Sequence, residues 1–467
     1  MAETRDAVGS PARSVLRIAV PMLPADLVAV LVPLAVLALM GRIDGDAHYV
    51  RALFMPVQFL FLALIAGIGA SNQVAAAVAH GAGDLRAAGA ALRADARIAA
   101  GAGAAFSVLL IVLAPLLGDL MGISEAARAE FTGFLRAIAP ASALLLGPAL
   151  AAATLRGCGL ARQAAAVTLL AALTEIGGVA LLALGAGLGI AGVAPAVALS
   201  GLAGTALGWV LLRRAAGLLG PGAPAPAGAL RPVPVRAAVR RLTAVGVPVG
   251  ASYLVICAAN LVLMRILAPF GPSVQSGYAN AATLQTLLII PGLVLGSATA
   301  IVLNSHRGAG RSGLLSPTLH AGLRITAGAY AVLAAVSYAG RGLLAGVMSG
   351  DAQIAAETAR YLQTVGLSYL LMGLVLAALT VLEQVGGGPA ALAMNAVYFV
   401  GAVAVGGWLA AASGPDALYR TIAAFNGLGA VAVGVTVWFV RRLATRETSG
   451  ASAPDTRPST IHTGKGT

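Results

Sequence analysis

Charged residues are scarce in this sequence. They make up 10% of the 467 residues, whereas 59% of the residues are hydrophobic. A soluble domain carries about 25% charged residues, so this chain has too few to cover a water-soluble surface. Its apolar runs are instead long enough to cross the roughly 30 Å of hydrocarbon in a bilayer. The sequence therefore predicts an all-α integral membrane protein.

Residues that carry enzyme chemistry are equally few. The single lysine, Lys465, is followed by Gly466 and cannot complete the Gly-Lys-Ser/Thr sequence of a nucleotide-binding P-loop. The two cysteines, Cys158 and Cys257, offer neither a disulfide framework nor a metal-ligand spacing. The sequence also lacks a His-Glu-x-x-His motif and a Gly-x-Ser-x-Gly motif. We therefore predict that the protein is not an enzyme and holds no metal or organic cofactor.

Hydropathy divides the chain into twelve membrane spans. Their predicted limits are 18–41, 52–79, 98–121, 133–155, 165–186, 191–212, 243–267, 280–304, 325–348, 361–382, 390–412 and 418–440.

The distribution of positive charge predicts the orientation of these spans. The net charge is +13, and with both termini on one side, 22 of the 30 Arg and Lys residues fall on that side. The positive-inside rule then predicts a multi-pass cell-membrane protein with both termini in the cytoplasm. A nucleic-acid-binding protein would need a basic face on a soluble domain, so we expect no nucleic-acid partner.

Polar segments suggest five regions. We predict disordered tails at 1–14 and 443–467, an N-terminal lobe at 15–213, a cytoplasmic Pro- and Arg-rich linker at 214–241, and a C-terminal lobe at 242–442. Six spans precede the linker and six follow it. Because six is an even number, the halves insert the same way up, which predicts two parallel six-helix repeats.

The second half of the chain repeats the first at an offset of 227 residues. The offset carries Pro21 to Pro248, and it also relates Gly69 to Gly296, Gly81-Ala82-Gly83 to Gly308-Ala309-Gly310, Met121 to Met348, Leu155 to Leu382 and Gly159 to Gly386. A duplicated half in a very apolar chain is typical of a secondary transporter whose site lies where the halves meet.

Several motifs, in order along the chain, resemble those of the multidrug and toxic compound extrusion (MATE) family. They are Leu16-Arg17-Ile18-Ala19-Val20-Pro21, Gly69-Ala70-Ser71, His80-Gly81-Ala82-Gly83-Asp84, Leu155-Arg156-Gly157-Cys158-Gly159, Gly189-Ile190-Ala191-Gly192 and the stretch from Met348 to Leu362. The resemblance covers roughly residues 15–440. It implies two six-helix lobes in a V, a cavity that opens alternately to each side, and export driven by an inward Na⁺ or H⁺ gradient.

The chain departs from this family at its usual cation-binding positions. Val36 stands where the family has an Asp in span one, and Val197 where it has a Thr in span six. The acids that some members place in spans seven and ten fall near Ile256 and Met372. The coupling chemistry of the family therefore does not carry over directly to this chain.

Two acids, Glu175 and Asp26, are predicted to lie well within spans. An acid in mid-bilayer costs several kcal/mol and usually faces a cavity, so both are candidates for coupling to H⁺ or Na⁺. For Glu175 the alternative is a protonated side chain that is hydrogen-bonded to a neighbouring helix. We expect Glu175, about halfway along span five, to be the main coupling residue.

Neutral polar residues in the spans are candidates for binding substrate or for interhelical hydrogen bonds. They are Asn72, Gln73, Asn260, Gln285, Asn395, Tyr398 and Asn426.

The sequence thus predicts a MATE-like antiporter that acts as a monomer and exports a small amphiphilic or apolar drug or metabolite. Because acids are few and aromatic residues are only 5% of the chain, we expect neutral or weakly basic substrates rather than polyvalent cations. Two alternatives stay open at this point. One is a flippase for lipid-linked or oligosaccharide substrates, although no Arg or Lys is predicted deep in a span. The other is a twelve-span transporter of the major facilitator type.

Overall fold

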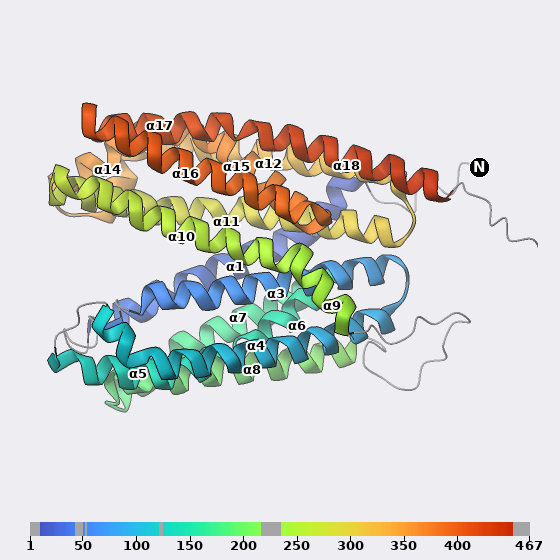
Figure 1. The fold of residues 1–467 in the computed structure, drawn as a ribbon, viewed down its shortest axis with the longest axis horizontal. Coiled ribbons are helices and arrows are strands. Elements are labelled where there is room, and N and C mark those ends of the chain that lie inside the picture. The colour runs from blue at the N-terminus through green and yellow to red at the C-terminus, as the bar shows by residue number, and fades with distance from the viewer. Residues whose placement is uncertain (1–9, 43–49, 52–53, 121–124, 216–234, 452–467) are drawn as a thin grey trace, which may run out of the picture.

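The computed structural model shows two helical lobes side by side (Figure 1). It describes residues 10–42, 50–51, 54–120, 125–215 and 235–451. These residues form helices and their connections and contain no β-strand, which confirms the predicted all-α class.

The N-lobe contains the first half of the chain. Its helices are α1 (Pro11–Met40), α3 (Met55–Gly81), α4 (Leu85–Leu120), α5 (Glu125–Ala143), α6 (Leu146–Gly157), α7 (Ala161–Val179), the π-helix η1 (Ala180–Gly185), the 3-10 helix η2 (Gly189–Gly192) and α8 (Val193–Arg214).

The C-lobe contains the second half. Its helices are α9 (Val235–Arg241), η3 (Leu242–Gly246), α10 (Val247–Leu267), η4 (Ala268–Phe270), α11 (Pro272–Gly308), η5 (Ser312–Leu314), α12 (Leu315–Ala339), α13 (Arg341–Met348), α14 (Ala352–Val365), η6 (Gly366–Ser368), α15 (Tyr369–Leu382), η7 (Glu383–Gly387), α16 (Gly388–Ser413), α17 (Pro415–Leu428) and α18 (Ala430–Ala451).

Eleven stretches of the described residues are long and apolar enough to cross a membrane. One of them, Ala352–Ser413, covers both the tenth and the eleventh predicted spans. Within it the π-helix η7 joins α15 to α16, and Gly386 has a φ of 108°, so the helix kinks at that residue. If Ala352–Ser413 is divided at this kink, the eleven stretches become twelve, in agreement with the twelve predicted spans.

Each lobe has its own apolar core, and α1 contributes to a third core between the lobes. Val15, Ile18 and Met22 of α1 pack with Ile290 and Val294 of α11. Helix α1 also packs against α7 in its own lobe and against α12 in the other. One helix of the N-lobe is therefore embedded in the contact between the lobes.

The duplication also governs how the lobes meet. Gly81 lies so close to α11 that an added Cβ would overlap the carbonyl of Ser305. Its repeat counterpart Gly308 lies in the same way against the carbonyl of Val78, and Val78 is the repeat counterpart of Ser305. The two contacts are related by a pseudo-twofold axis that passes through the contact surface between the two lobes. We call this contact surface the seam. Glycine allows this close approach of the two backbones.

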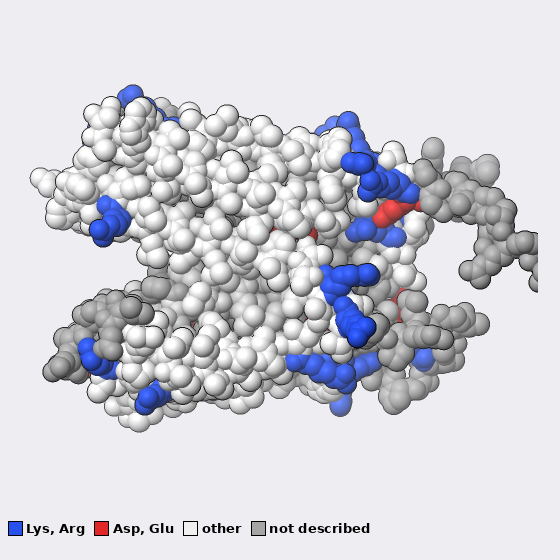
Figure 2. All heavy atoms as spheres, viewed as in Figure 1, with Lys and Arg blue, Asp and Glu red and all other residues white. Residues whose placement is uncertain are grey.

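Positive charge gathers at one end of the molecule (Figure 2). We call this the basic end; it contains the start of α1, the α3–α4 turn and the end of α18. The close glycine contacts between the lobes lie there. The surface is hollowed between the lobes at the opposite end, which we call the open end (Figure 2).

Three of the predicted domain limits fall inside helices. Helix α1 begins at Pro11 because the Ser10 hydroxyl accepts a hydrogen bond from the Arg13 N–H at 3.4 Å and proline suits the first turn. Helix α18 runs on to Ala451, and Glu447 near its end pairs with Arg307 at 2.9 Å. The tails expected to be disordered, 1–14 and 443–467, are thus partly helical. The predicted linker 214–241 is helical from Val235, and residues 1–9, 216–234 and 452–467 lie outside the described residues.

Candidate functional site

The candidate site is the cleft between the lobes together with the buried polar groups that surround it. The cleft is closed at the basic end by α3, which packs against α10 and α11 of the other lobe. Gly67 of α3 and Gly246 of η3 are too close together to admit a side chain on either. The two lobes therefore form a V with its vertex at the basic end.

Asp26 lies at the lobe interface and is paired with arginine. Its Oδ1 is 3.5 Å from Nη1 of Arg156 in the last turn of α6, and the two side chains are 27% and 21% exposed. Water therefore reaches this pair. Tyr253 of α10, in the C-lobe, lies within electrostatic reach of both charges. The predicted acid of span one is thus one half of an ion pair that faces the other lobe.

Glu383 is a buried acid that the sequence reasoning missed. It accepts a hydrogen bond from Ser252 Oγ of α10 at 2.8 Å, and Ser252 Oγ in turn accepts one from the Asn395 side chain at 3.0 Å. We had expected Asp26 and Glu175 to be the only acids within the spans, and that expectation is wrong. Glu383 directly follows the predicted limit of span ten, where η7 continues the helix. The repeat offset pairs it with Arg156, a signal that could have pointed to it.

Gln73 joins the two lobes by hydrogen bonds. Its side-chain amide lies on α3 and donates to Ser297 Oγ at 2.8 Å and to Gln384 Oε1 at 2.9 Å, both in the C-lobe. The Asn304 side chain then donates to the Gln384 carbonyl at 3.0 Å. Gln73 is therefore part of the seam that must separate if the basic end opens.

A bidentate ion pair also crosses the seam. Nη2 of Arg241, in α9, donates to both carboxylate oxygens of Asp95 in α4, at 2.9 and 2.8 Å. Its Nε donates to Ser71 Oγ at 3.3 Å. Bidentate arginine–carboxylate pairs are among the stronger hydrogen-bonded contacts in proteins. This pair holds the start of the C-lobe against the N-lobe.

Glu175 lies inside the N-lobe rather than at the seam. On α7 the buried positions include Ala172, Glu175 and Val179, a spacing of three and four residues that places them on one helix face. Glu175 is 9% exposed and lies among apolar residues of the N-lobe core. The helix therefore directs this acid into the lobe.

Arg51 supplies the positive charge that acts on Glu175. It is only 2% exposed, its Nη2 donates to Gln58 Oε1 at 2.8 Å, and its guanidinium lies 5.4 Å from the centre of the Phe54 ring. The sequence reasoning placed Arg51 near an outer span end and found no arginine deep in the spans. The described span does begin after it, at Val57, but the Arg51 side chain is buried in the N-lobe together with Val50 and Phe54.

The part of the C-lobe that corresponds by the repeat to the surroundings of Arg51 in the N-lobe contains neutral polar residues. The Tyr361 hydroxyl donates to Gln285 Oε1 at 2.9 Å, and the Tyr398 hydroxyl donates to Asn426 Oδ1 at 2.7 Å. The Asn426 amide donates to Ser368 Oγ at 2.8 Å. The predicted candidates Tyr398 and Asn426 are thus hydrogen-bonded to each other, and Gln285 is in a separate pair of the same lobe; their binding of substrate stays a prediction.

Two other candidates lie apart from the seam. Asn72 is fully buried, and its amide donates to the Leu150 carbonyl at 3.1 Å and to Thr154 Oγ1 at 2.7 Å, which ties α3 to α6. Asn260 is exposed on α10 and donates to the Ile256 carbonyl of its own helix. Their predicted role in binding substrate is untested. The contacts of Asn72 match the alternative reading as an interhelical hydrogen bond.

Both cysteines are free. Cys158 lies in the turn between α6 and α7, and its burial raises the pKa of the thiol to about 11. At neutral pH it therefore stays a thiol of low reactivity. It serves as an apolar packing residue among the buried residues of the N-lobe.

The MatE family model matches this chain in two segments, residues 21–181 and 248–409. Together the two segments cover more than half of the chain, and they begin 227 residues apart, one in each lobe. The chain therefore belongs to the MATE family of transporters, as the motifs predicted. This membership removes the major facilitator alternative. No curated protein matches the sequence.

Solved structures of transporters share the fold. The Vibrio cholerae MATE transporter VcmN in the bent form superposes with a TM-score of 0.85 at 16% sequence identity, covering 94% of this chain and 98% of that one. A MOP superfamily transporter from Pyrococcus furiosus, reported with a binding pocket of reverse polarity, gives 0.82 at 18% identity over 94% and 97%. A multidrug resistance MATE family transporter in an outward-facing conformation gives 0.82 at 20% identity over 94% and 97%. These likenesses confirm the two-lobed fold.

Proposed function

We propose that this chain is a proton-coupled antiporter that exports a small apolar or weakly basic compound by alternating access. The observation that carries the proposal is the burial of Glu175 and Arg51 together inside the N-lobe. In a low-dielectric core, burial favours the neutral acid, whereas a nearby cation favours the carboxylate. Movement of Arg51 relative to Glu175 would therefore change whether Glu175 holds a proton.

The same pair favours H⁺ over Na⁺ as the coupling ion. A sodium site needs several oxygen ligands around the ion, and a guanidinium within electrostatic reach of the carboxylate repels a second cation. A proton needs only the carboxylate itself. Asp26 is the second candidate for coupling, because its pair with Arg156 is partly exposed at the seam. No organic cofactor is part of this mechanism.

The orientation in the proposal follows from the arginine distribution. Positive residues gather at the basic end (Figure 2), and cytoplasmic ends of membrane proteins are enriched in Arg and Lys. We place the basic end in the cytoplasm of the cell membrane, with both termini there and the open end outside. The structure then corresponds to an outward-facing state of a monomeric transporter.

The substrate class follows from the few charges at the cleft. Asp26 is neutralised by Arg156, and Glu383 is hydrogen-bonded to Ser252. A permanent dication would therefore lack a free carboxylate in a site of low dielectric. Gln285, Asn395 and Tyr398 are the candidates for hydrogen bonds to the substrate. A lipid-linked or oligosaccharide substrate is less well supported, because Arg156 is balanced by Asp26 and the cleft is not basic.

Reconstituted protein tests the coupling. Purified transporter in liposomes should move a fluorescent weakly basic amphiphile when a pH gradient is imposed, and not when a Na⁺ gradient alone is imposed. Glu175→Gln should abolish the pH-driven movement. The matched control Glu447→Gln, at the end of α18, should retain it. Transport driven by Na⁺ alone would overturn proton coupling, and full pH-driven transport by Glu175→Gln would remove Glu175 from the mechanism.

A further inference from the structure

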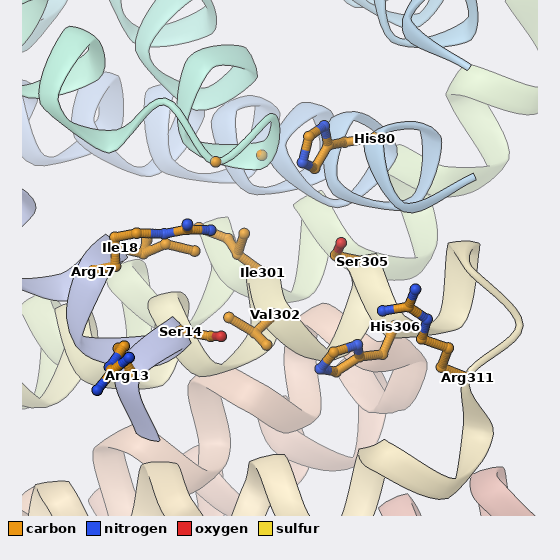
Figure 3. A pocket seen from close by; sticks show the side chains of 12 residues that line it. Arg13, Ser14, Arg17, Ile18, His80, Ile301, Val302, Ser305, His306 and Arg311 are labelled. Carbon is orange, nitrogen blue, oxygen red and sulfur yellow. The ribbon is translucent and has the colours of Figure 1, made fainter. Parts of the chain in front are cut away.

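A cavity of about 280 Å³ opens on the basic end where the two lobes meet (Figure 3). Arg13 and Arg17 of α1 and His80 of α3 line it from the N-lobe. His306 at the end of α11 and Arg311 just after it line it from the C-lobe. The lining contains three arginines and two histidines, and no acid.

The three arginines are available to bind a ligand. All are exposed, and within the described part of the chain none of them forms an ion pair. The charge of Arg17 acts on His80 and that of Arg311 acts on His306, so each lobe brings its own cation to the cavity. With the basic end closed, these like charges repel each other across the seam.

Arg311 carries the opposite charge to its repeat counterpart. Its counterpart in the N-lobe is Asp84, which accepts a hydrogen bond from the Ala87 N–H at 2.9 Å and caps the start of α4. Arg311 stands at the start of η5, makes no such cap, and lines the cavity instead. A cation at a helix N-terminus is electrostatically unfavourable. An anion bound in the cavity would offset this cost.

We propose that this cavity binds a phosphate-bearing anion between the arginines of the two lobes, and that the anion stabilises the state in which the basic end is closed. The planar forks of arginine fit phosphate oxygens, and basic pockets between membrane helices bind the headgroups of anionic lipids. The anion neutralises the repulsion across the seam. When the lobes separate at this end, the two halves of the site move apart and the anion is released. The site goes beyond export itself and needs no particular substrate.

Phosphate could come from a lipid headgroup or from solution, and one experiment separates the two. The melting temperature of the full-length transporter in detergent is measured with phosphatidylglycerol, with phosphatidylcholine, and with inorganic phosphate against chloride at equal ionic strength. We expect phosphatidylglycerol to raise it by about 3 °C over phosphatidylcholine. A rise with inorganic phosphate in place of phosphatidylglycerol would identify a soluble source. A rise with neither would overturn the proposal.

Variants assign the effect to this cavity. The double variant Arg17→Gln, Arg311→Gln should lose the rise, whereas Arg93→Gln, an exposed arginine of α4 outside the cavity, should keep it. An equal rise in the double variant would show general attraction to a basic surface and overturn the site. A second measurement is the amount of phosphatidylglycerol that remains bound after size-exclusion chromatography. If the anion is a lipid, it should fall in the double variant and not in Arg93→Gln.

Discussion

The two lobes share one fold but differ in their charged residues. At positions related by the repeat, Arg51 of the N-lobe corresponds to Tyr278, and Asp26 corresponds to Tyr253. Arg156, which pairs with Asp26, corresponds to Glu383, which is hydrogen-bonded by Ser252. Eight of the nine tyrosines lie in the C-lobe. The duplication preserved the helices, whereas the buried polar groups diverged.

The difference suggests that the two lobes have different roles, which we call the division of labour between them. The N-lobe buries an acid beside a cation, and a buried acid can exchange a proton. The corresponding part of the C-lobe has hydroxyl and amide groups, which form hydrogen bonds without carrying charge. Gly81 and Gly308, in contrast, are matched between the lobes, and each touches the backbone of the other lobe. The symmetry is retained at this pair of contacts and is lost among the buried charged groups.

The largest expected effect comes from breaking the buried charges of the N-lobe. Arg51→Gln leaves Glu175 buried without its cation, which should destabilise the fold by about 3–5 kcal/mol and abolish pH-driven export. The matched change in the C-lobe, Tyr278→Phe, removes one hydroxyl and should cost less than about 1.5 kcal/mol. Unfolding in detergent and transport by liposomes would measure both. Equal losses in the two variants would contradict the division of labour.

The second test concerns the seam, where the lobes should behave alike. Gly81→Ala and Gly308→Ala each place a methyl group against a backbone carbonyl of the other lobe, at a cost of about 1–3 kcal/mol. Both should open the basic end. The measure is maleimide labelling of Ser305→Cys in a background without native cysteines, which should become faster. Gly328→Ala, where an added Cβ meets nothing, is the control. If only one of the two glycine variants responds, the seam is not symmetric.

A smaller effect is expected at the turns that follow α3 and α11. Asp84→Ala removes the cap of α4 and should cost about 1 kcal/mol. Arg311→Asp should stabilise the start of η5 by up to about 1 kcal/mol, because an acid replaces a cation at a helix N-terminus. Thermal unfolding without anionic lipid would measure both changes. If Arg311→Asp destabilises the protein under these conditions, Arg311 has a structural contact that the repeat comparison overlooks.

The smallest effect is expected from making the C-lobe resemble the N-lobe. Tyr361 corresponds to Phe134, and Tyr361→Phe removes one hydrogen bond to the partly buried Gln285. Water can replace part of that bond, so we expect a loss of about 0.5 kcal/mol and little change in transport. Thermal unfolding and the rate of substrate export are the two measurements. A large loss of transport at unchanged stability would place the Tyr361–Gln285 pair in the substrate site.

Part of the candidate site could be predicted from the sequence. Glu175 stood out because an acid in an apolar span is energetically costly, and Gln73 because it is an amide side chain in a predicted span. Glu383 could not be recognised in the same way, because it falls where hydropathy alone would end the span. Arg51 precedes a span in the sequence, and only the tertiary structure shows that its side chain is buried within electrostatic reach of Glu175. Asn72 is also an amide side chain and lies next to Gln73 in the same predicted span. Its hydrogen bonds nevertheless stay within one lobe.

The membrane class, the twelve spans, the repeat and the family could all be predicted from the order of residues alone. Each of these depends on composition, on the length of apolar runs or on a fixed offset, which are properties of the chain in order. The tertiary structure decided which polar groups meet. Asp26 pairs with Arg156, Arg51 lies within electrostatic reach of Glu175, and Arg17 and Arg311 line one cavity, although the members of each pair are far apart in sequence. Whether such groups pair, repel or face a cavity depends on distances of a few ångströms between helices, which the order of residues does not specify.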